Sequence, residues 1–213
     1  MTPPRTALID YGAGNLRSVA KALTRSGLDV AITSDAGAIR DADAVVLPGA
    51  GAFADAMEHL RAKGLVDTVR EKLAAGGPYL GLCLGLQLLF EESEEHGLTA
   101  GFAVIEGRVE RFATEVAPGE RRRVPHIGWN AVRFSGDHPM LRALPAEDYY
   151  YFVHAYHAVP KDPGVVVGRA DYHGEFAAAV ASEGVFAVQF HPEKSQAAGK
   201  RLIDAFATWV RES

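Results

Sequence analysis

The chain has 213 residues, of which 48% are hydrophobic and 23% charged, and its formal net charge is −5. This composition is typical of an ordinary globular protein, and the negative charge argues against a nucleic-acid partner. The longest apolar stretch is too short and too rich in glycine to span a bilayer, so we expect no membrane contact. One cysteine permits no internal disulfide and the first residues lack an export signal, so we predict a cytoplasmic protein.

The first ninety residues alternate between strand and helix patterns. Strands are predicted at residues 6–10, 28–33, 44–47 and 79–82, because each is a short apolar run bounded by turn residues. Helices are predicted after the first and third of these strands and again at 65–75, where apolar residues recur at helical spacing. This alternation favours an α/β fold with a parallel, doubly wound sheet.

A glycine turn at residues 11–15 follows the first predicted strand and opens a helix. Such a turn is typical of a phosphate site. The dinucleotide fingerprint needs three spaced glycines, however, and Gly12 and Gly14 supply only two. Nucleotide binding is therefore the weaker interpretation of this turn.

After Gly97 the pattern changes to β alternation interrupted by turn residues. Six segments show it, at 102–112, 123–134, 149–156, 165–170, 176–181 and 185–190. They predict a second, mostly antiparallel group of strands, and a helix from about 197 to 211 closes the chain. No repeat or long linker divides the sequence, so we predict one domain over residues 1–213.

The chain's only cysteine lies between two glycines, in Gly81-Leu82-Cys83-Leu84-Gly85. A helix is predicted from Leu84 to Phe90. A nucleophile elbow has this pattern, in which a nucleophile between glycines joins a strand to a helix. The dipole and free N–H groups of a helix N-terminus favour the thiolate over the thiol. A single cysteine is more often a small buried hydrophobe, but this context favours a nucleophile.

A thiolate nucleophile needs a base, and the base needs an orienting group. His191-Pro192-Glu193 directly follows the apolar run 185–190. Residues two apart on an extended segment face the same way, so Glu193 can orient the imidazole of His191. A structural role is the common alternative for one histidine, and the cysteine elbow favours the catalytic one.

The other histidines predict no metal site. His154 and His157 are three residues apart, which places them on opposite faces of a strand. The remaining five are isolated from any ligand-like cluster, and these are His59, His96, His126, His138 and His173. We therefore expect neither a metal nor a cofactor.

Together, Gly-Leu-Cys-Leu-Gly-Leu-Gln at 81–87 and His191-Pro192-Glu193 resemble the class I, or triad, glutamine amidotransferase family. The resemblance implies a three-layer α/β fold, with a mainly parallel central sheet flanked by helices and a smaller antiparallel β group. It implies that Cys83 attacks the side-chain amide of glutamine and forms a γ-glutamyl thioester, which water hydrolyses. His191 would act as base and then as acid toward the leaving ammonia, and Glu193 would orient it.

The same resemblance assigns binding roles. The oxyanion would be held by the backbone N–H of Leu84 and by one from the preceding glycine loop, which contains Gly49, Ala50 and Gly51. The substrate L-glutamine would be held by Gln87, Glu95, His154, Ala155 and Tyr156. The carboxylate of Glu95 suits the α-ammonium group, whereas its acidic neighbours are expected to form a solvated face.

Five segments in order narrow the resemblance to the glutaminase subunits of imidazole glycerol phosphate synthase, over essentially the whole chain. They are residues 10–16, 48–53, 87–95, 125–130 and 191–195. The implied partner is a (β/α)8-barrel cyclase subunit in a heterodimer, which uses the ammonia in histidine biosynthesis. Asn15, Trp129 and Lys194 match positions at the contact with that barrel.

Alternatives stay open at this point. The chain could be a stand-alone cysteine hydrolase, or the glutaminase of another synthase such as that of pyridoxal phosphate or anthranilate synthesis. A third interpretation is a non-catalytic binding module with a vestigial triad. The presence of a suitable residue at every triad position argues against it. For the first interpretation we expect low glutaminase activity of the chain alone, raised by its partner.

Overall fold

The computed structural model of the chain describes residues 2–12 and 14–213. In its first half the elements are β1 (Arg5–Ile9), α1 (Leu16–Arg25), β2 (Asp29–Thr33), α2 (Ala36–Asp41), β3 (Ala44–Leu47), α3 (Phe53–Ala62), α4 (Val66–Ala74), β4 (Tyr79–Leu82), α5 (Leu84–Gln87) and β5 (Phe90–Ser93). The glycine turn predicted at residues 11–15 contains Ala13, which lies outside the described residues.

The second half is built mostly of strands. Its elements are β6 (Thr99–Ala100), β7 (Ile105–Arg111), β8 (Glu115–Ala117), β9 (Glu120–Arg121), β10 (His126–Phe134), η1 (Pro139–Ala143), β11 (Glu147–His154), β12 (Tyr156–Pro160), η2 (Pro163–Val165), β13 (Val166–Asp171), β14 (Glu175–Ser182), β15 (Val185–Val188), η3 (Pro192–Lys194) and α6 (Gln196–Glu212).

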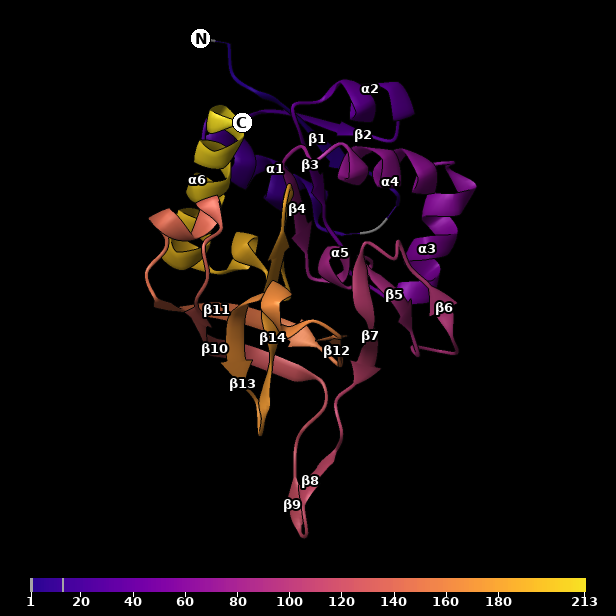
Figure 1. The fold of residues 1–213 in the computed structure, drawn as a ribbon, viewed down its shortest axis with the longest axis vertical. Helices are drawn as coiled ribbons and strands as arrows, with labels where there is room; N and C mark the ends of the chain where they lie inside the picture. The colour runs from indigo at the N-terminus through magenta and orange to yellow at the C-terminus, as the bar shows by residue number, and fades with distance from the viewer. Residues whose placement is uncertain (1, 13) are drawn as a thin grey trace.

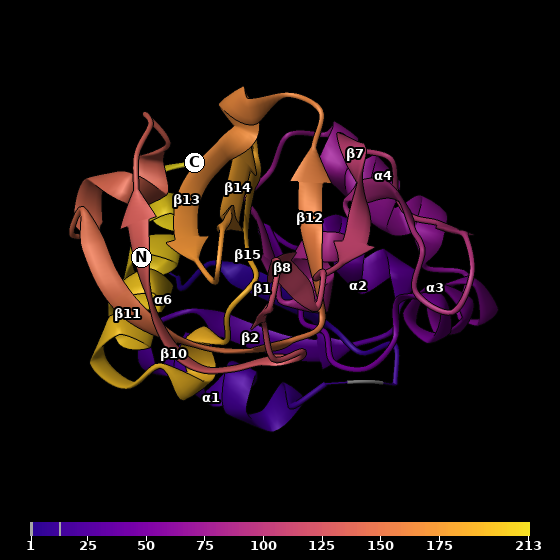
Figure 2. The same cartoon turned by 90° about the horizontal axis from the view of Figure 1, so that it is seen from below.

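A nine-stranded mixed sheet forms the middle layer, in the order β11-β10-β13-β14-β15-β4-β3-β1-β2. The strands from β15 to β2 are parallel, as predicted for the first half of the chain. The antiparallel strands predicted after Gly97 partly extend this same sheet, from β14 to β11. Of the others, β6, β7 and β12 join β5 in a separate four-stranded sheet, β12-β7-β5-β6, which lies beside β14 (Figure 2), and β8 pairs with β9 alone.

Two hydrophobic cores lie on opposite faces of the large sheet. Alternate residues of a strand point to opposite sides, so Val46 of β3 joins one core and Val45 the other. Helices α1 and α6 cover the first face, and α3 and α4 cover the second (Figure 1). The result is the α/β/α layering expected of this fold class.

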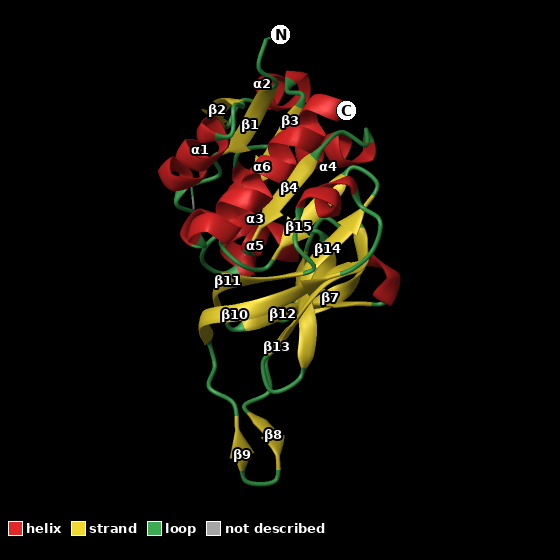
Figure 3. Ribbon diagram, turned by 90° about the vertical axis from the view of Figure 1, so that its left-hand side faces the viewer, coloured by secondary structure: helices red, strands yellow, loops and turns green. Residues whose placement is uncertain are grey.

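Some boundaries differ from the sequence prediction. The helix expected from Leu84 to Phe90 ends at Gln87, because Phe90–Ser93 is strand β5 and pairs with β6 and β7. The strand expected at 149–156 is two strands, since the chain turns at Ala155 and β12 joins the small sheet. Helix α2 and the hairpin of β8 and β9, which projects from the body (Figure 3), were not predicted.

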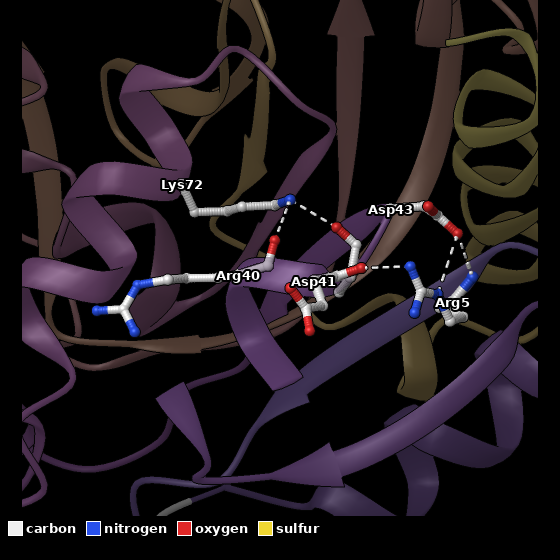
Figure 4. A network of polar contacts seen from close by, with 6 residues as sticks. Arg5, Arg40, Asp41, Asp43 and Lys72 are labelled. Carbon is white, nitrogen blue, oxygen red and sulfur yellow. Dashed lines mark hydrogen bonds and ion pairs between the residues drawn. The ribbon is translucent and has the colours of Figure 1, made fainter. Parts of the chain in front are cut away.

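Exposed polar contacts tie the N-terminal ends of the parallel strands together (Figure 4). Arg5, the first residue of β1, donates from its backbone to the Asp43 carboxylate at 2.7 Å and from its guanidinium to the Asp41 carbonyl at 2.7 Å. Lys72 of α4 donates to the Arg40 carbonyl at 3.2 Å. Exposed contacts of this kind contribute little stability, so the two apolar cores hold this end of the sheet.

Among the described residues, no helix is both long enough and apolar enough to cross a membrane.

Candidate active site

The turn between β4 and α5 holds Cys83 in a backbone conformation that few non-glycine residues adopt, with φ 53° and ψ −103°. Its N–H donates to the carbonyl of Val188 at 2.7 Å, which ties the turn to the end of β15. The backbone of β3 also approaches closely, since a Cβ on Gly85 would overlap the carbonyl oxygen of Leu47. This strained, tightly packed turn has the geometry of a nucleophile elbow.

The pairing of β15 with β4 brings the predicted base to the predicted nucleophile. These strands run parallel, with Val188 opposite Leu82, so the residues that follow each strand emerge side by side. Cys83 follows β4, and His191 follows β15 after two more residues. Segments more than a hundred residues apart thus meet at one edge of the sheet, where ligands of open α/β sheets bind.

His191 lies between the thiol and a carboxylate. Its Nδ1 is 2.9 Å from Oε1 of Glu193, and both side chains are buried. With Nδ1 used in this way, Nε2 remains for the sulfur of Cys83. Burial lowers the pKa of His191, but hydrogen bonds and charge from Cys83 and Glu193 outweigh it and raise the pKa to about 10. These contacts therefore favour a protonated imidazole next to the sulfur of Cys83.

A cavity of about 330 Å³ opens above this pair. Its walls contain most of the residues singled out from the sequence, namely Ala50, Gly51, Cys83, Leu84, Gln87, Glu95, His154, Ala155, Tyr156, His191 and Lys194. Pro125 and Val153, not singled out, complete the lining. Gly49 and Glu193 are not part of the lining; Gly49 belongs to the glycine loop, and Glu193 contacts the imidazole of His191.

Two polar side chains of the cavity are already oriented by the protein. Gln87 is buried and donates from Nε2 to the carbonyl of Tyr156 at 2.9 Å, which leaves its Oε1 as the acceptor. Glu95 accepts at Oε2 from the backbone N–H of Phe53 at 2.7 Å, at the first turn of α3. Both residues therefore offer fixed oxygen atoms, which suit a positively charged group of a small ligand.

The glycine loop 48–51 packs against the start of α5. A Cβ on Gly49 would overlap the Cβ of Leu84, so only glycine permits this approach. Tyr11 fixes the loop from behind, because its buried hydroxyl donates to the Pro48 carbonyl at 3.0 Å. Leu84 is the first residue of α5, so its N–H has no acceptor earlier in the helix. The loop and this N–H thus lie together, as expected for an oxyanion hole.

The three residues predicted to contact a partner lie outside the cavity or at its rim. Trp129 of β10 is 47% exposed and packs edge-on against Tyr151 of β11. Nζ of Lys194 lies 5.8 Å from the centre of the same Tyr151 ring. Asn15 is exposed at the start of α1 and its side chain makes no capping hydrogen bond. Trp129 and Lys194 thus form one exposed cluster around Tyr151.

The structure brings together two histidines that the sequence did not connect. β10 and β11 pair with His126 opposite His154, and their rings approach to 3.2 Å between Nδ1 and Nε2. Burial lowers the pKa of His126 to about 4 and that of His154 to about 3, so both are neutral. Across the described residues, no group of three or more histidine, cysteine, aspartate or glutamate side chains could hold a metal ion.

Two buried polar residues near the site were missed. Gln189 contacts the sulfur of Cys83, and Ser195 bonds to the backbone of His191. Both are completely buried. A signal existed for Gln189, since it is the one polar residue in the apolar run 185–190 and a buried polar group needs a partner.

The family model for class-I glutamine amidotransferases matches residues 7–208. The chain belongs to this family. The amidotransferase is 52% identical over 208 residues to the imidazole glycerol phosphate synthase subunit HisH of Methylococcus capsulatus, with 95% of each chain covered. It is 47% identical over 207 residues to the subunit of that name from Moorella thermoacetica, with 97% of this chain and 96% of the relative covered.

Solved structures agree with the fold of this amidotransferase. A crystal structure described as a glutamine amidotransferase matches with a TM-score of 0.73 at 22% identity, over 96% of this chain and 98% of the other. The structure of PurLQS from Thermotoga maritima matches with a TM-score of 0.71 at 18% identity, over 100% of this chain and 99% of the other. At such low identity these matches speak for the fold alone, and with the family match they confirm the predicted fold class.

Proposed function

We propose that this amidotransferase is the glutaminase subunit of an imidazole glycerol phosphate synthase. Identity of 52% over 95% of the Methylococcus capsulatus subunit supports this assignment. The chain, acting as one domain in the cytoplasm, hydrolyses L-glutamine to L-glutamate and ammonia. The ammonia passes to a cyclase subunit, which forms imidazole glycerol phosphate and an aminoimidazole carboxamide ribotide from a ribulosyl intermediate.

The single observation that carries the chemistry is the shared cavity of Cys83, His191 and Gln87. In our proposal the thiolate of Cys83 attacks the side-chain carbonyl carbon of glutamine. The N–H of Leu84 and one from the glycine loop bind the resulting oxyanion. Removing one such donor typically costs about 2.7–4 kcal/mol of transition-state stabilisation.

Proton transfer in this mechanism belongs to His191. Its raised pKa, about 10, keeps a proton on the imidazole at neutral pH. His191 donates that proton to the leaving nitrogen, so ammonia departs and a γ-glutamyl thioester remains on Cys83. Neutral His191 then takes a proton from water as its oxygen attacks the thioester, and collapse of the intermediate releases glutamate and restores the thiolate. Glu193 holds the ring throughout.

The oriented oxygens of the cavity support glutamine as the ligand. The carboxylate of Glu95 and Oε1 of Gln87 both attract the α-ammonium group of an amino acid. His154 is neutral, and its Nδ1 is 2.8 Å from the Tyr156 carbonyl, so it shapes the wall without adding charge. Its neighbour Ala155 presents backbone and a small side chain, which leaves space for the ligand.

The partner in this proposal is a (β/α)8-barrel cyclase that docks on the face around Tyr151. Trp129 and Lys194 both contact Tyr151, and the neighbouring Ile127 is 60% exposed. Exposed aromatic and aliphatic side chains grouped on one face are typical of a docking surface. Asn15 would contact the same partner from the start of α1.

The test is a glutaminase assay of the purified chain alone and with the barrel cyclase and its ribulosyl ligand. We expect a low rate alone and a rate raised by the partner, because uncoupled hydrolysis wastes glutamine. Cys83→Ala should lose about 10⁴-fold or more of the activity, and Trp129→Ala should weaken stimulation without removing the basal rate. Equal rates with and without partner would contradict the coupling, and a surviving rate in Cys83→Ala would contradict the nucleophile.

A further inference from the structure

The buried side chain of Gln189 lies directly against the sulfur of Cys83. Its Nε2 is 3.5 Å from Sγ, within the range of a hydrogen bond to sulfur. The residue is 0% exposed, and its backbone N–H extends the sheet by donating to the Ala178 carbonyl at 2.9 Å. Placing an amide in an apolar core is unfavourable unless its polar atoms are bonded. Its presence here therefore points to a role at the sulfur.

The orientation of this amide follows from its neighbours. Oε1 of Gln189 is 3.1 Å from Nε2 of Gln87, which can only donate. That same Nε2 also donates to the Tyr156 carbonyl, so the side-chain amide of Gln87 cannot be flipped by 180° without losing both hydrogen bonds. The oxygen of Gln189 must therefore face Gln87. Its NH₂ group then faces Cys83.

We propose that Gln189 is a further catalytic residue, whose amide N–H donates to the thiolate of Cys83 and holds the sulfur in position for attack. This role in the reaction rests on the proposed glutaminase function, whereas the contact itself does not. A hydrogen bond from a neutral donor to an anion favours the anion. The sulfur thus has two supports, the imidazolium of His191 and the amide of Gln189.

The contact also links ligand binding to the nucleophile. Gln87 lines the cavity and uses its Nε2 to hold Gln189, so one side chain contacts both the cavity and the support of the sulfur. The segment from Val188 to His191 therefore contacts Cys83 three times, through the Val188 carbonyl, the Gln189 amide and the imidazole. It acts as a continuous support for the attacking sulfur.

The experiment uses Gln189→Met, which keeps the size of the side chain and removes the donor, and Gln189→Glu, which turns a donor into an anion. The readouts are the rate of Cys83 alkylation by iodoacetamide from pH 5 to 10, and kcat and KM for glutamine with the partner present. For Gln189→Met we expect a kcat lower by about tenfold to hundredfold, with KM within about threefold. The pH midpoint of alkylation should rise by about one unit or more, and further in Gln189→Glu.

Thr6→Val is the matched control. Thr6 is buried near the N-terminal end of β1, and its hydroxyl has no hydrogen-bond partner among the described residues. This variant therefore also removes a buried polar group, but at the end of the parallel strands opposite to the one that carries the site. It should leave the alkylation midpoint and kcat unchanged. Gln87→Met, which frees the oxygen of Gln189, should raise the midpoint in the same direction but by less.

An unchanged alkylation midpoint in folded Gln189→Met would overturn the proposal. If that variant fails to fold, Gln189→Glu and Gln87→Met decide it by the same measurement. Alkylation needs neither glutamine nor a partner. A wild-type chain without glutaminase activity in the presence of its partner would therefore contradict the proposed function, while the shift of the alkylation midpoint would still decide the contact between Gln189 and Cys83.

Discussion

The hydroxyl of Ser195 donates a hydrogen bond of 2.7 Å to the backbone carbonyl of His191. The same oxygen accepts from the N–H of Tyr151 at 3.0 Å, and the N–H of His191 donates to the Tyr151 carbonyl at 2.9 Å. These three bonds close a ring between β11 and the segment that carries the base. Because Ser195 is completely buried, water cannot replace its hydroxyl, and the position of His191 depends on it.

Ser195→Ala should therefore lower the free energy of unfolding by about 1–3 kcal/mol, since it leaves the N–H of Tyr151 without its acceptor and removes one of the two donors to the His191 carbonyl, the other being the N–H of Lys194. It should also lower kcat more than it raises KM, because the imidazole loses its backbone anchor. Urea denaturation and steady-state glutaminase assays measure the two effects. Ser135→Ala, at an exposed position, is the control. Equal stabilities of the two variants would show that the ring does not hold this segment.

Gly199→Ala should move the catalytic segment away from α6. A Cβ on Gly199 would overlap the carbonyl oxygen of Pro192, which lies between His191 and Glu193. Alanine gains about 1 kcal/mol of helix propensity over glycine, but overpacking typically costs about 1–3 kcal/mol, so we expect net destabilisation and lower activity. Thr208→Ala, exposed on the same helix, should be neutral. A Gly199→Ala variant more stable than wild type would contradict this contact.

Stability should fall on the alkaline side as His191 loses its proton. Its folded pKa of about 10 is above the ordinary value of 6.5, so its contribution is fully present below about pH 6.5 and is lost as the pH rises through 10. Glu193→Gln removes a negative charge beside the ring and lowers the folded pKa, so the loss of stability above pH 6.5 should be smaller and should be complete at a lower pH. Urea denaturation from pH 6 to 10 measures this, with exposed Glu183→Gln as control. Superimposable profiles would contradict the pairing.

The free energy of unfolding should also fall at acidic pH, because His126 and His154 are buried in their neutral form. Burial lowers the pKa of His126 to about 4 and of His154 to about 3, so from pH 6.5 downward the unfolded chain takes up protons that the folded chain does not. Stability due to this pair is therefore lost between about pH 6.5 and 3. His126→Asn should reduce the slope of unfolding free energy against pH in that interval, whereas His59→Asn, at an exposed position, should not. An unchanged slope in His126→Asn would show that His126 is not the group concerned.

The local pattern around Cys83 could be predicted from the order of the residues alone. Two glycines around a cysteine between a strand and a helix can form only a tight turn, and the structure shows that turn with φ 53° at Cys83. The contact between His191 and Glu193 was also predicted, but its stated reason was wrong, because Pro192–Lys194 is the 3-10 helix η3 and not an extended segment. Short-range geometry is fixed by neighbours in the chain, so sequence patterns predict it well.

Which distant side chains meet could not be predicted from the sequence, because it depends on how the strands pair. The pairing of β15 with β4 brings Gln189 to Cys83, and the register of β10 against β11 puts His126 opposite His154. Neither contact follows from spacing along the chain, because strand order and register are set by packing of the whole sheet. The shortness of α5 has the same cause. The helix ends at Gln87 because Phe90, in the same apolar run, begins strand β5, which pairs with β7. The nucleophile elbow could therefore be predicted from the sequence, whereas the contact of the Gln189 amide with its sulfur could not.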